Sequence, residues 1–202
     1  MNKKNRTSSG GQIRIIGGLW RGRKLPVPDS GGLRPTTDRV RETLFNWLAA
    51  DIQGARCLDC FSGSGALGLE ALSRHAASAT LLELERPVAR QLEKNLATLG
   101  VAESTGRVIN TNTLTWLAQT GEPFDIVFID PPFRQGLLQQ TLSLLEQHQW
   151  LAETAMVYIE SETEAGLPDV PANWHLHREK QAGQVAYRLY QRQMENEDEL
   201  PC

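Results

Sequence analysis

The sequence predicts an α/β protein built on a doubly wound, mostly parallel sheet. From Gly54 onward, short apolar runs alternate with amphipathic segments, the pattern of strands joined by helices that cover both faces of a sheet. A glycine-rich turn, FSGSGALG, links the first strand to its helix. Two β-like runs flank Ala182-Gly183 near the end of the chain and predict an antiparallel hairpin that extends the sheet.

Seven strands are expected, and right-handed crossovers leave few ways to connect the parallel ones. In order they are ARCLDCF, ATLLELE, GRVIN, FDIVFID, AMVYIES, WHLHREK and QVAYRLYQRQ. The helices between them are GALGLEALSRHA, PVARQLEKNLATLG, TLTWLAQT and QGLLQQTLSLLEQH.

An extension over residues 12–50 precedes the main domain, which we place at residues 51–192. QIRIIGG and WRGRKLPVP predict a small β-hairpin. A helix follows a Thr-Thr-Asp capping cluster, with its apolar residues at helical spacing and Arg39 and Arg41 expected on its polar side. Residues 1–11 are expected to be a disordered basic tail and residues 193–202 an acidic one.

The length of 202 residues and the absence of a long apolar run predict a soluble, cytoplasmic, monomeric protein without a membrane span. The net charge of -3 is unevenly distributed. Residues 1–50 hold ten Lys and Arg against three acids, a formal +7, so the remaining 152 residues carry -10. A basic arm on an acidic body predicts that a polyanion is bound at one end, although a solvated tail also explains residues 3–6.

The first strand ends in Asp59 and leads into a loop in which Gly63, Gly65 and Gly68 form G-x-G-x-x-G. Glu83 follows at the end of the next strand, where an acid can bind a ribose hydroxyl. The glycine spacing fits a dinucleotide as well as other adenosine ligands. Asp59 would repel a pyrophosphate but favour the cationic S-adenosylmethionine, although it can also cap the loop by accepting backbone N–H groups.

Asn112 follows the third strand and has two possible roles. It is placed to contact the edge of an adenine, or to cap the helix that begins TLTWL. Both interpretations stay open at this point.

The fourth strand ends in the unusual run FIDPPF. Each proline constrains itself and the residue before it, so the segment from Asp130 is stiff before any substrate arrives. Neither Pro131 nor the following proline has an N–H, which leaves an edge of carbonyls and one carboxylate. Such acceptors suit an exocyclic NH2 group, and Phe133 offers a face on which a base can stack.

These segments resemble a known family. Asp59 to Gly68 and Asp130 to Phe133 are similar to the cofactor loop and the D/N-P-P-Y/F motif of Rossmann-like class I S-adenosylmethionine-dependent amino-methyltransferases. RIIGGLWRGRKLPVP and LRPTTDRVRETLFNWL resemble more specifically the RsmD family, which methylates guanine N2 in small-subunit (16S) ribosomal RNA. The resemblance covers roughly residues 12–192.

The resemblance implies a role for each of several residues. Asp130, Pro131 and Phe133 would hold the target base, and the cofactor would bind Asp59, Phe61, Gly63, Gly65, Glu83, Asn112 and Asp130. The partner implied is ribosomal RNA or the small ribosomal subunit. Its phosphates would meet Arg14, Arg21, Arg23, Lys24, Arg34, Arg39 and Arg41.

Three other functions compete with this interpretation. Adenine N6 in DNA and the amide of a protein glutamine also present an NH2 group. The glycine spacing alone would fit a nicotinamide oxidoreductase, but Asp59 and the D-P-P-F segment argue against that function. An inactive RNA-binding factor would have no need of the acceptor edge. No metal site is expected, because Cys57 and Cys60 form a single C-x-x-C within a strand-like run.

Overall fold

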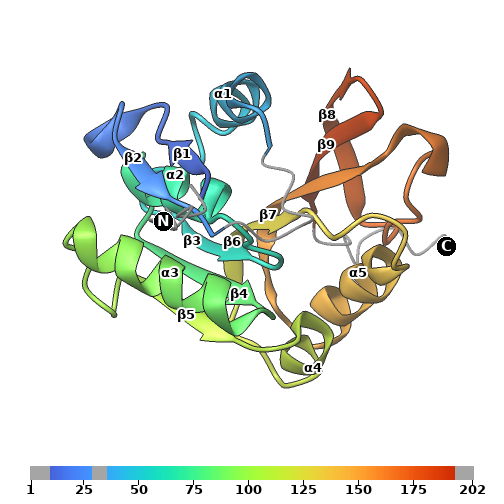
Figure 1. Cartoon of the computed structure of the whole chain (residues 1–202). Coiled ribbons are helices and arrows are strands. Elements are labelled where there is room, and N and C mark those ends of the chain that lie inside the picture. Colours follow the sequence, from blue (N-terminus) through green and yellow to red (C-terminus); the bar gives the residue numbers. More distant parts are fainter. Residues whose placement is uncertain (1–9, 29–35, 194–202) are drawn as a thin grey trace, which may run out of the picture.

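The computed structural model describes residues 10–28 and 36–193, so nearly all of both predicted tails, and Arg34, lie outside the described residues. Its main sheet has seven strands in the order β5-β4-β3-β6-β7-β9-β8 (Figure 1). The strands are β3 (Arg56–Asp59), β4 (Ser78–Glu83), β5 (Gly106–Asn110), β6 (Phe124–Ile129), β7 (Leu151–Glu162), β8 (Trp174–Ala182) and β9 (Val185–Arg192).

The first five strands of this sheet are parallel, and β9 runs antiparallel to both β7 and β8. The predicted fold class is therefore confirmed, including the C-terminal hairpin. The strand β7 begins at Leu151, earlier than the apolar run AMVYIES indicated, and its pairing with β6 shifts register between Phe124 and Ile126.

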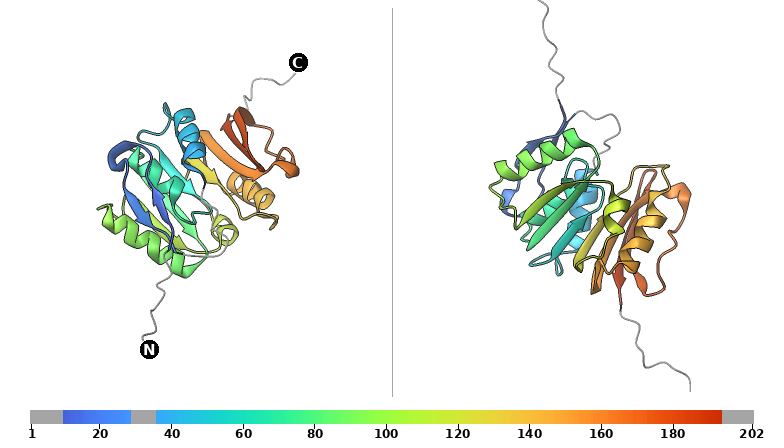
Figure 2. Two further views of the ribbon diagram at one scale, coloured as in Figure 1. Left: turned by 45° about the horizontal axis from the view of Figure 1, so that its top comes forward. Right: turned by 90° about the horizontal axis from the view of Figure 1, so that it is seen from below.

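Helices cover both faces of the sheet (Figure 2). They are α1 (Asp38–Trp47), α2 (Ala66–Ser73), α3 (Arg86–Thr98), α4 (Thr113–Leu117) and α5 (Leu137–Gln147), with short 3-10 helices at Gly18–Trp20 and Thr163–Ala165. Buried side chains of α1, α2 and α3 form one apolar core with one face of the sheet, and those of α4 and α5 form a second core on the opposite face. Within the described residues, no helix is long and apolar enough to cross a membrane.

The N-terminal extension forms a separate two-stranded antiparallel sheet from β1 (Gln12–Arg14) and β2 (Lys24–Pro26). Ile13, Ile15 and Leu25 anchor this hairpin because they are buried in the same core as α1, α2 and α3. Asn95 of α3 is also buried, and its amide nitrogen donates to the Pro26 carbonyl at 3.0 Å. The hairpin therefore lies on the helices that follow β3 and β4.

The helix α1 starts and packs as predicted. Thr37 is its N-cap and accepts a hydrogen bond from the backbone N–H of Val40, which satisfies one of the donors left free at a helix start. Its apolar residues at helical spacing, Val40, Leu44 and Phe45, are buried.

The expected position of Arg41 on the polar side of this helix is wrong. Its side chain is 3% exposed, donates to the Arg14 carbonyl at 2.8 Å and pairs with Asp38 at 2.7 Å. It also lies 3.6 Å from the carboxylate of Glu70, a buried residue of α2. Arg41 is therefore a link between the hairpin, α1 and α2, and it is not placed to meet RNA. Arg39 is exposed, as expected.

Candidate active site

The site lies where the order of the parallel strands reverses. The chain runs from β3 outward to β4 and β5, then returns to β6 on the other side of β3. Ligands of open α/β sheets bind at this switch point, beyond the carboxyl ends of the strands. Asp59 ends β3, Glu83 ends β4 and Asp130 directly follows β6. Three of the predicted site residues thus meet at one edge.

A cavity of about 1020 Å³ occupies this edge. Five acids line it, and no Lys, Arg or His does among the residues that the structure describes. The acids are Asp59, Glu83, Glu85, Asp130 and Glu160. Such a lining attracts a cationic ligand and repels phosphate groups.

The glycine loop brings backbone close to this cavity. Gly63 and Gly65 have φ of 50° and 79°, values that favour glycine, and Gly65 is the N-cap of α2. Gly68 is a packing position, since a Cβ atom there would lie 3.0 Å from the side chain of Leu81. The three glycines predicted as a motif therefore serve a turn, a helix start and a helix–strand contact.

Glu83 connects the glycine loop to the end of β4 through hydrogen bonds. One carboxylate oxygen accepts the backbone N–H of Gly63 at 2.9 Å, and the other accepts that of Glu85 at 2.8 Å. Burial raises the pKa of Glu83, against the effect of these hydrogen bonds. Each carboxylate oxygen can accept more than one hydrogen bond, so lone pairs remain for a ligand. Glu85 is the N-cap of α3 and lies two positions before Pro87.

Asp59 is buried beneath the loop with 2% of its surface exposed. It accepts the backbone N–H of Gly68 at 3.2 Å, and the N–H of Phe61 also donates to it. Burial raises its pKa from 3.8 to about 7, and the neighbouring charges of Glu83 and Glu160 act in the same direction. The loop-capping interpretation is confirmed, and the carboxyl group also lines the cavity, where a cation would stabilise its charged form.

Asn112 caps α4, because its side-chain oxygen accepts the N–H of Thr115 at 3.1 Å. It also lines the cavity together with Phe61. Capping uses only the amide oxygen, which leaves its NH2 group for a ligand. A contact of Asn112 with adenine therefore stays a prediction.

The D-P-P-F segment forms another wall of the cavity, with Pro131 and Phe133 among the lining residues. Phe133 is 38% exposed, so its ring is available for contact. Burial and the nearby Glu160 raise the pKa of Asp130 well above its usual range. Thr36, which was not predicted as a site residue, places its hydroxyl 3.5 Å from the Asp130 carboxyl.

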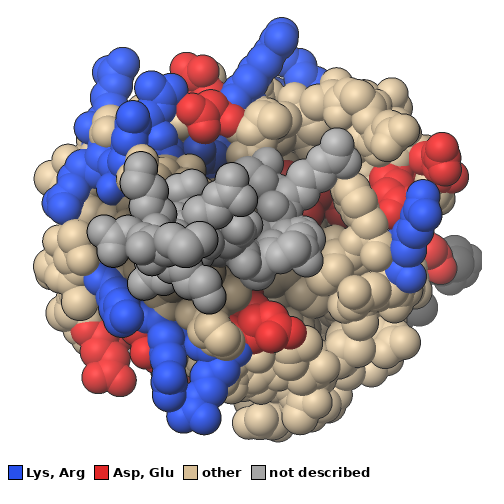
Figure 3. Space-filling model, viewed as in Figure 1, with Lys and Arg blue, Asp and Glu red and all other residues tan. Residues whose placement is uncertain are grey.

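Cations gather outside the cavity. Arg14, Arg21, Arg23 and Lys24 of the hairpin are exposed, and Arg14 pairs with Asp38 at 2.9 Å on the surface. On the face seen in Figure 3, Lys and Arg side chains cluster around the hairpin and α3, with acidic side chains among them.

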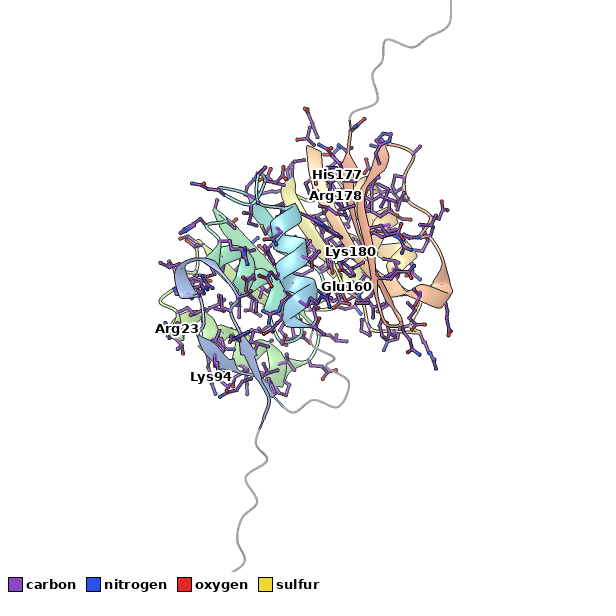
Figure 4. The ribbon with its side chains drawn as sticks, turned by 90° about the horizontal axis from the view of Figure 1, so that it is seen from above. Arg23, Lys94, Glu160, His177, Arg178 and Lys180 are labelled. Carbon is purple, nitrogen blue, oxygen red and sulfur yellow. The ribbon has the colours of Figure 1, made fainter. Side chains whose placement is uncertain are left out.

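Three exposed cations of α3 were missed by the sequence analysis. Arg86, Arg90 and Lys94 follow one another at four-residue intervals, which places them along one side of the helix. Figure 4 shows Arg23 and Lys94 near one another, with Glu160 well apart from them toward β8 and β9. We call the exposed cations of the hairpin and α3 the basic surface, namely Arg14, Arg21, Arg23, Lys24, Arg86, Arg90 and Lys94.

Neither cysteine of the C-x-x-C pair is exposed. Cys57 and Cys60 are buried and free, in different apolar cores, and burial raises the pKa of both thiols. Within residues 10–28 and 36–193, no group of three or more His, Cys, Asp or Glu side chains is arranged to hold a metal ion.

Comparison with known proteins identifies the family. A family model described as "Conserved hypothetical protein 95" matches residues 13–191. "Ribosomal RNA small subunit methyltransferase D" of Escherichia coli (strain K12) is 68% identical over 197 residues, 98% of either chain. The chain belongs to the family of ribosomal RNA small subunit methyltransferase D. A member from Haemophilus influenzae is 52% identical and matches 95% of this chain and all of its own.

Solved structures agree with this family and with the fold. A putative methyltransferase of Escherichia coli superimposes with a TM-score of 0.86 at 68% identity, covering 91% of this chain and 99% of its own. An RNA methyltransferase of Salinibacter ruber, solved with S-adenosyl-L-homocysteine, gives a TM-score of 0.59 over 84% of this chain and all of its own. At 18% identity that second likeness shows the fold alone. The predicted family is confirmed, and the protein is a methyltransferase enzyme.

Proposed function

We propose that the protein transfers the methyl group of S-adenosylmethionine to the exocyclic N2 amino group of a guanine in small-subunit (16S) ribosomal RNA. The observation that carries this proposal is the acidic cavity beside the D-P-P-F edge, with no described cation in its lining. A sulfonium and an ammonium fit such a cavity, whereas the pyrophosphate of a nicotinamide cofactor would be repelled. The names of the bacterial relatives support the ribosomal RNA substrate.

Four residues of the cavity have a proposed task in binding the cofactor. Asp59 faces the ammonium side of the cofactor, Glu83 accepts the ribose hydroxyls, and Phe61 and Asn112 lie against the adenine. Bound there, S-adenosylmethionine supplies an electrophilic methyl carbon. The backbone of Gly63 and Gly65 allows close approach to the cofactor because no side chain stands in the way.

The D-P-P-F edge orients the nucleophile. The lone pair of a guanine amino group is delocalised into the ring, so the group attacks poorly unless it is held in line. Asp130 and the carbonyl of Pro131 accept its two hydrogens, and Phe133 stacks against the base. The target base must leave its stack to reach this edge, as in other enzymes that modify bases.

The basic surface binds the RNA backbone. We assign residues 12–50 to RNA binding and residues 51–192 to catalysis, with the cations of α3 continuing the surface onto the catalytic domain. Arg39 belongs to the same set, because it is exposed on α1. Arg34 lies outside the described residues and precedes Thr36 by two positions in the sequence. We expect Arg34→Ala to weaken RNA binding in a filter assay while cofactor affinity stays near wild type.

The reaction is tested by identifying the methylated nucleoside. Purified protein is incubated with methyl-tritiated S-adenosylmethionine and small ribosomal subunits that lack their native methylations, and the RNA is then digested. Label in N2-methylguanosine, lost in Asp130→Ala, is the expected result. Cofactor binding without label in that RNA would refute the proposal, and DNA adenine and protein glutamine would then be tested as acceptors.

A further inference from the structure

A second buried carboxyl group lies beside Asp130. The parallel pairing of Ile129 with Ile159 brings the next residue of each strand, Asp130 and Glu160, to the same level at the edge of the sheet. Glu160 is 6% exposed and lines the cavity. The proposed binding of cofactor and base leaves it without a task.

The hydrogen bonds around Glu160 hold its charge in place. The hydroxyl of Tyr158 donates to Glu160 Oε1 at 2.7 Å, and the hydroxyl of Thr36 lies 3.2 Å from the same oxygen. The same Thr36 hydroxyl lies 3.5 Å from the Asp130 carboxyl, so the carboxyl groups of Asp130 and Glu160 are neighbours. Among the described residues, no Lys or Arg forms an ion pair with either acid.

Two neighbouring carboxyl groups in a buried site share one negative charge, because a second charge would add repulsion to the cost of burial. Burial raises the pKa of both groups, and the hydrogen bonds that Glu160 accepts lower its pKa in part. Glu160 also accepts the Tyr158 hydroxyl, which stabilises a charge there, so we place the shared proton on Asp130 and the charge on Glu160. The other titratable groups that face Glu160 are Tyr158 on its own strand, Asp59 from β3 and Tyr187, its partner on β9.

We propose that Glu160 is a positioning residue that acts through Asp130 and receives the proton of Asp130 when guanine N2 loses one of its own. This inference rests on the proposed function. As N2 forms its bond to the methyl carbon, the carbon–sulfur bond breaks and its electron pair stays on sulfur. The N2 proton passes to the free oxygen of Asp130, and the proton already on Asp130 passes to Glu160.

The step removes charge from a buried site. Before it, the sulfonium is positive and Asp130 and Glu160 share one negative charge; after it, the thioether and both of these carboxyl groups are neutral. A buried pair of acids is a stronger base than a solvated carboxylate, because burial favours the neutral form. The pair loses its extra proton to solvent when the product leaves.

The test is the single-turnover rate of methyl transfer, measured from about pH 5 to about pH 9. We expect Glu160→Gln to lower the plateau rate roughly 10²-fold, the order expected when a proton acceptor is removed. The acid limb of the profile should also move to higher pH, because it then reports protonation of a buried Asp130, which lacks the hydrogen bond from Tyr158 that lowers the pKa of Glu160. The affinity for S-adenosylhomocysteine, measured by calorimetry, should change by no more than about twofold.

Glu153→Gln is the matched control, since Glu153 lies on the same strand but is exposed. It should leave both the rate and the profile unchanged. A Glu160→Gln profile that superimposes on the wild-type profile after scaling would overturn the proposal, because a purely structural role lowers the rate equally at every pH.

A second variant covers the case in which Glu160→Gln fails to fold. Tyr158→Phe keeps both carboxyl groups but removes a donor to Glu160, so the acid limb should move to higher pH. An unmoved limb in that variant would equally overturn the proposal. Failure of the proposed function has a different signature, because wild-type protein would then place no label in N2-methylguanosine.

Discussion

Replacement by alanine should lower the stability of the protein at Arg41 but lower its RNA affinity at Arg39. Arg41→Ala removes a charged donor 2.8 Å from the Arg14 carbonyl, a bond worth about 1.5–3 kcal/mol. Its pair with Asp38 adds at most about 1 kcal/mol, because Asp38 is 51% exposed. Glu70 keeps three other donors, the backbone N–H groups of Ile16 and Gly17 and the side chain of Arg74, so its charge is not left without partners.

Together these contacts predict that Arg41→Ala lowers the free energy of unfolding by about 2–4 kcal/mol. Arg39 is exposed, so Arg39→Ala should change it by no more than about 0.5 kcal/mol. Urea denaturation of both variants measures the difference. RNA affinity, measured where both are folded, should fall for Arg39→Ala only. Equal stability of the two variants would refute the assignment of Arg41 to the link between hairpin and helices.

Two further predictions concern the cavity. The folded protein keeps a proton on Asp59 up to about pH 7, whereas the unfolded chain releases it near 3.8, so this residue's contribution to stability falls as pH rises through that window. Without cofactor, the free energy of unfolding should therefore fall less between pH 5 and pH 8 in Asp59→Asn than in wild type. Denaturation at both pH values measures this decrease, and an equal decrease in the two proteins would contradict the raised pKa of Asp59. Phe133→Ala should lower kcat/KM for RNA roughly 10–100-fold, because the base loses its stacking partner, and should leave the affinity for the cofactor unchanged in calorimetry. Reduced affinity for the cofactor together with an unchanged kcat/KM for RNA would show that Phe133 contacts the cofactor and not the base.

Local signals in the sequence predicted most of the fold. Apolar alternation indicated the strands, and the spacing of Val40, Leu44 and Phe45 indicated the buried side of α1. Acids at the ends of strands predicted Asp59, Glu83 and Asp130 as neighbours, because parallel strands end at one edge.

What the sequence did not show are contacts between distant segments. Arg41 is buried because it meets Glu70 of another helix, and nothing near Arg41 in the chain reveals that partner. Thr36 reaches Glu160 across 124 positions. Glu160 itself carried a signal in the sequence, since it directly follows the apolar run AMVYI.

The four-residue spacing of Arg86, Arg90 and Lys94 was equally visible. Its meaning depends on the hairpin packing beside α3, where Asn95 binds Pro26. Only the fold shows that the two sets of cations form one surface.

We propose that an acidic cavity binds the cofactor while a separate basic surface binds RNA. The most direct measurement is equilibrium titration of S-adenosylhomocysteine and of small-subunit ribosomal RNA against two variants. Glu83→Ala should lose affinity for the cofactor and keep that for RNA. The triple variant Arg86→Ala, Arg90→Ala, Lys94→Ala should keep cofactor affinity and bind RNA more weakly, with a shallower salt dependence. A triple variant with unchanged RNA affinity, or a Glu83→Ala protein with unchanged cofactor affinity, would contradict the account.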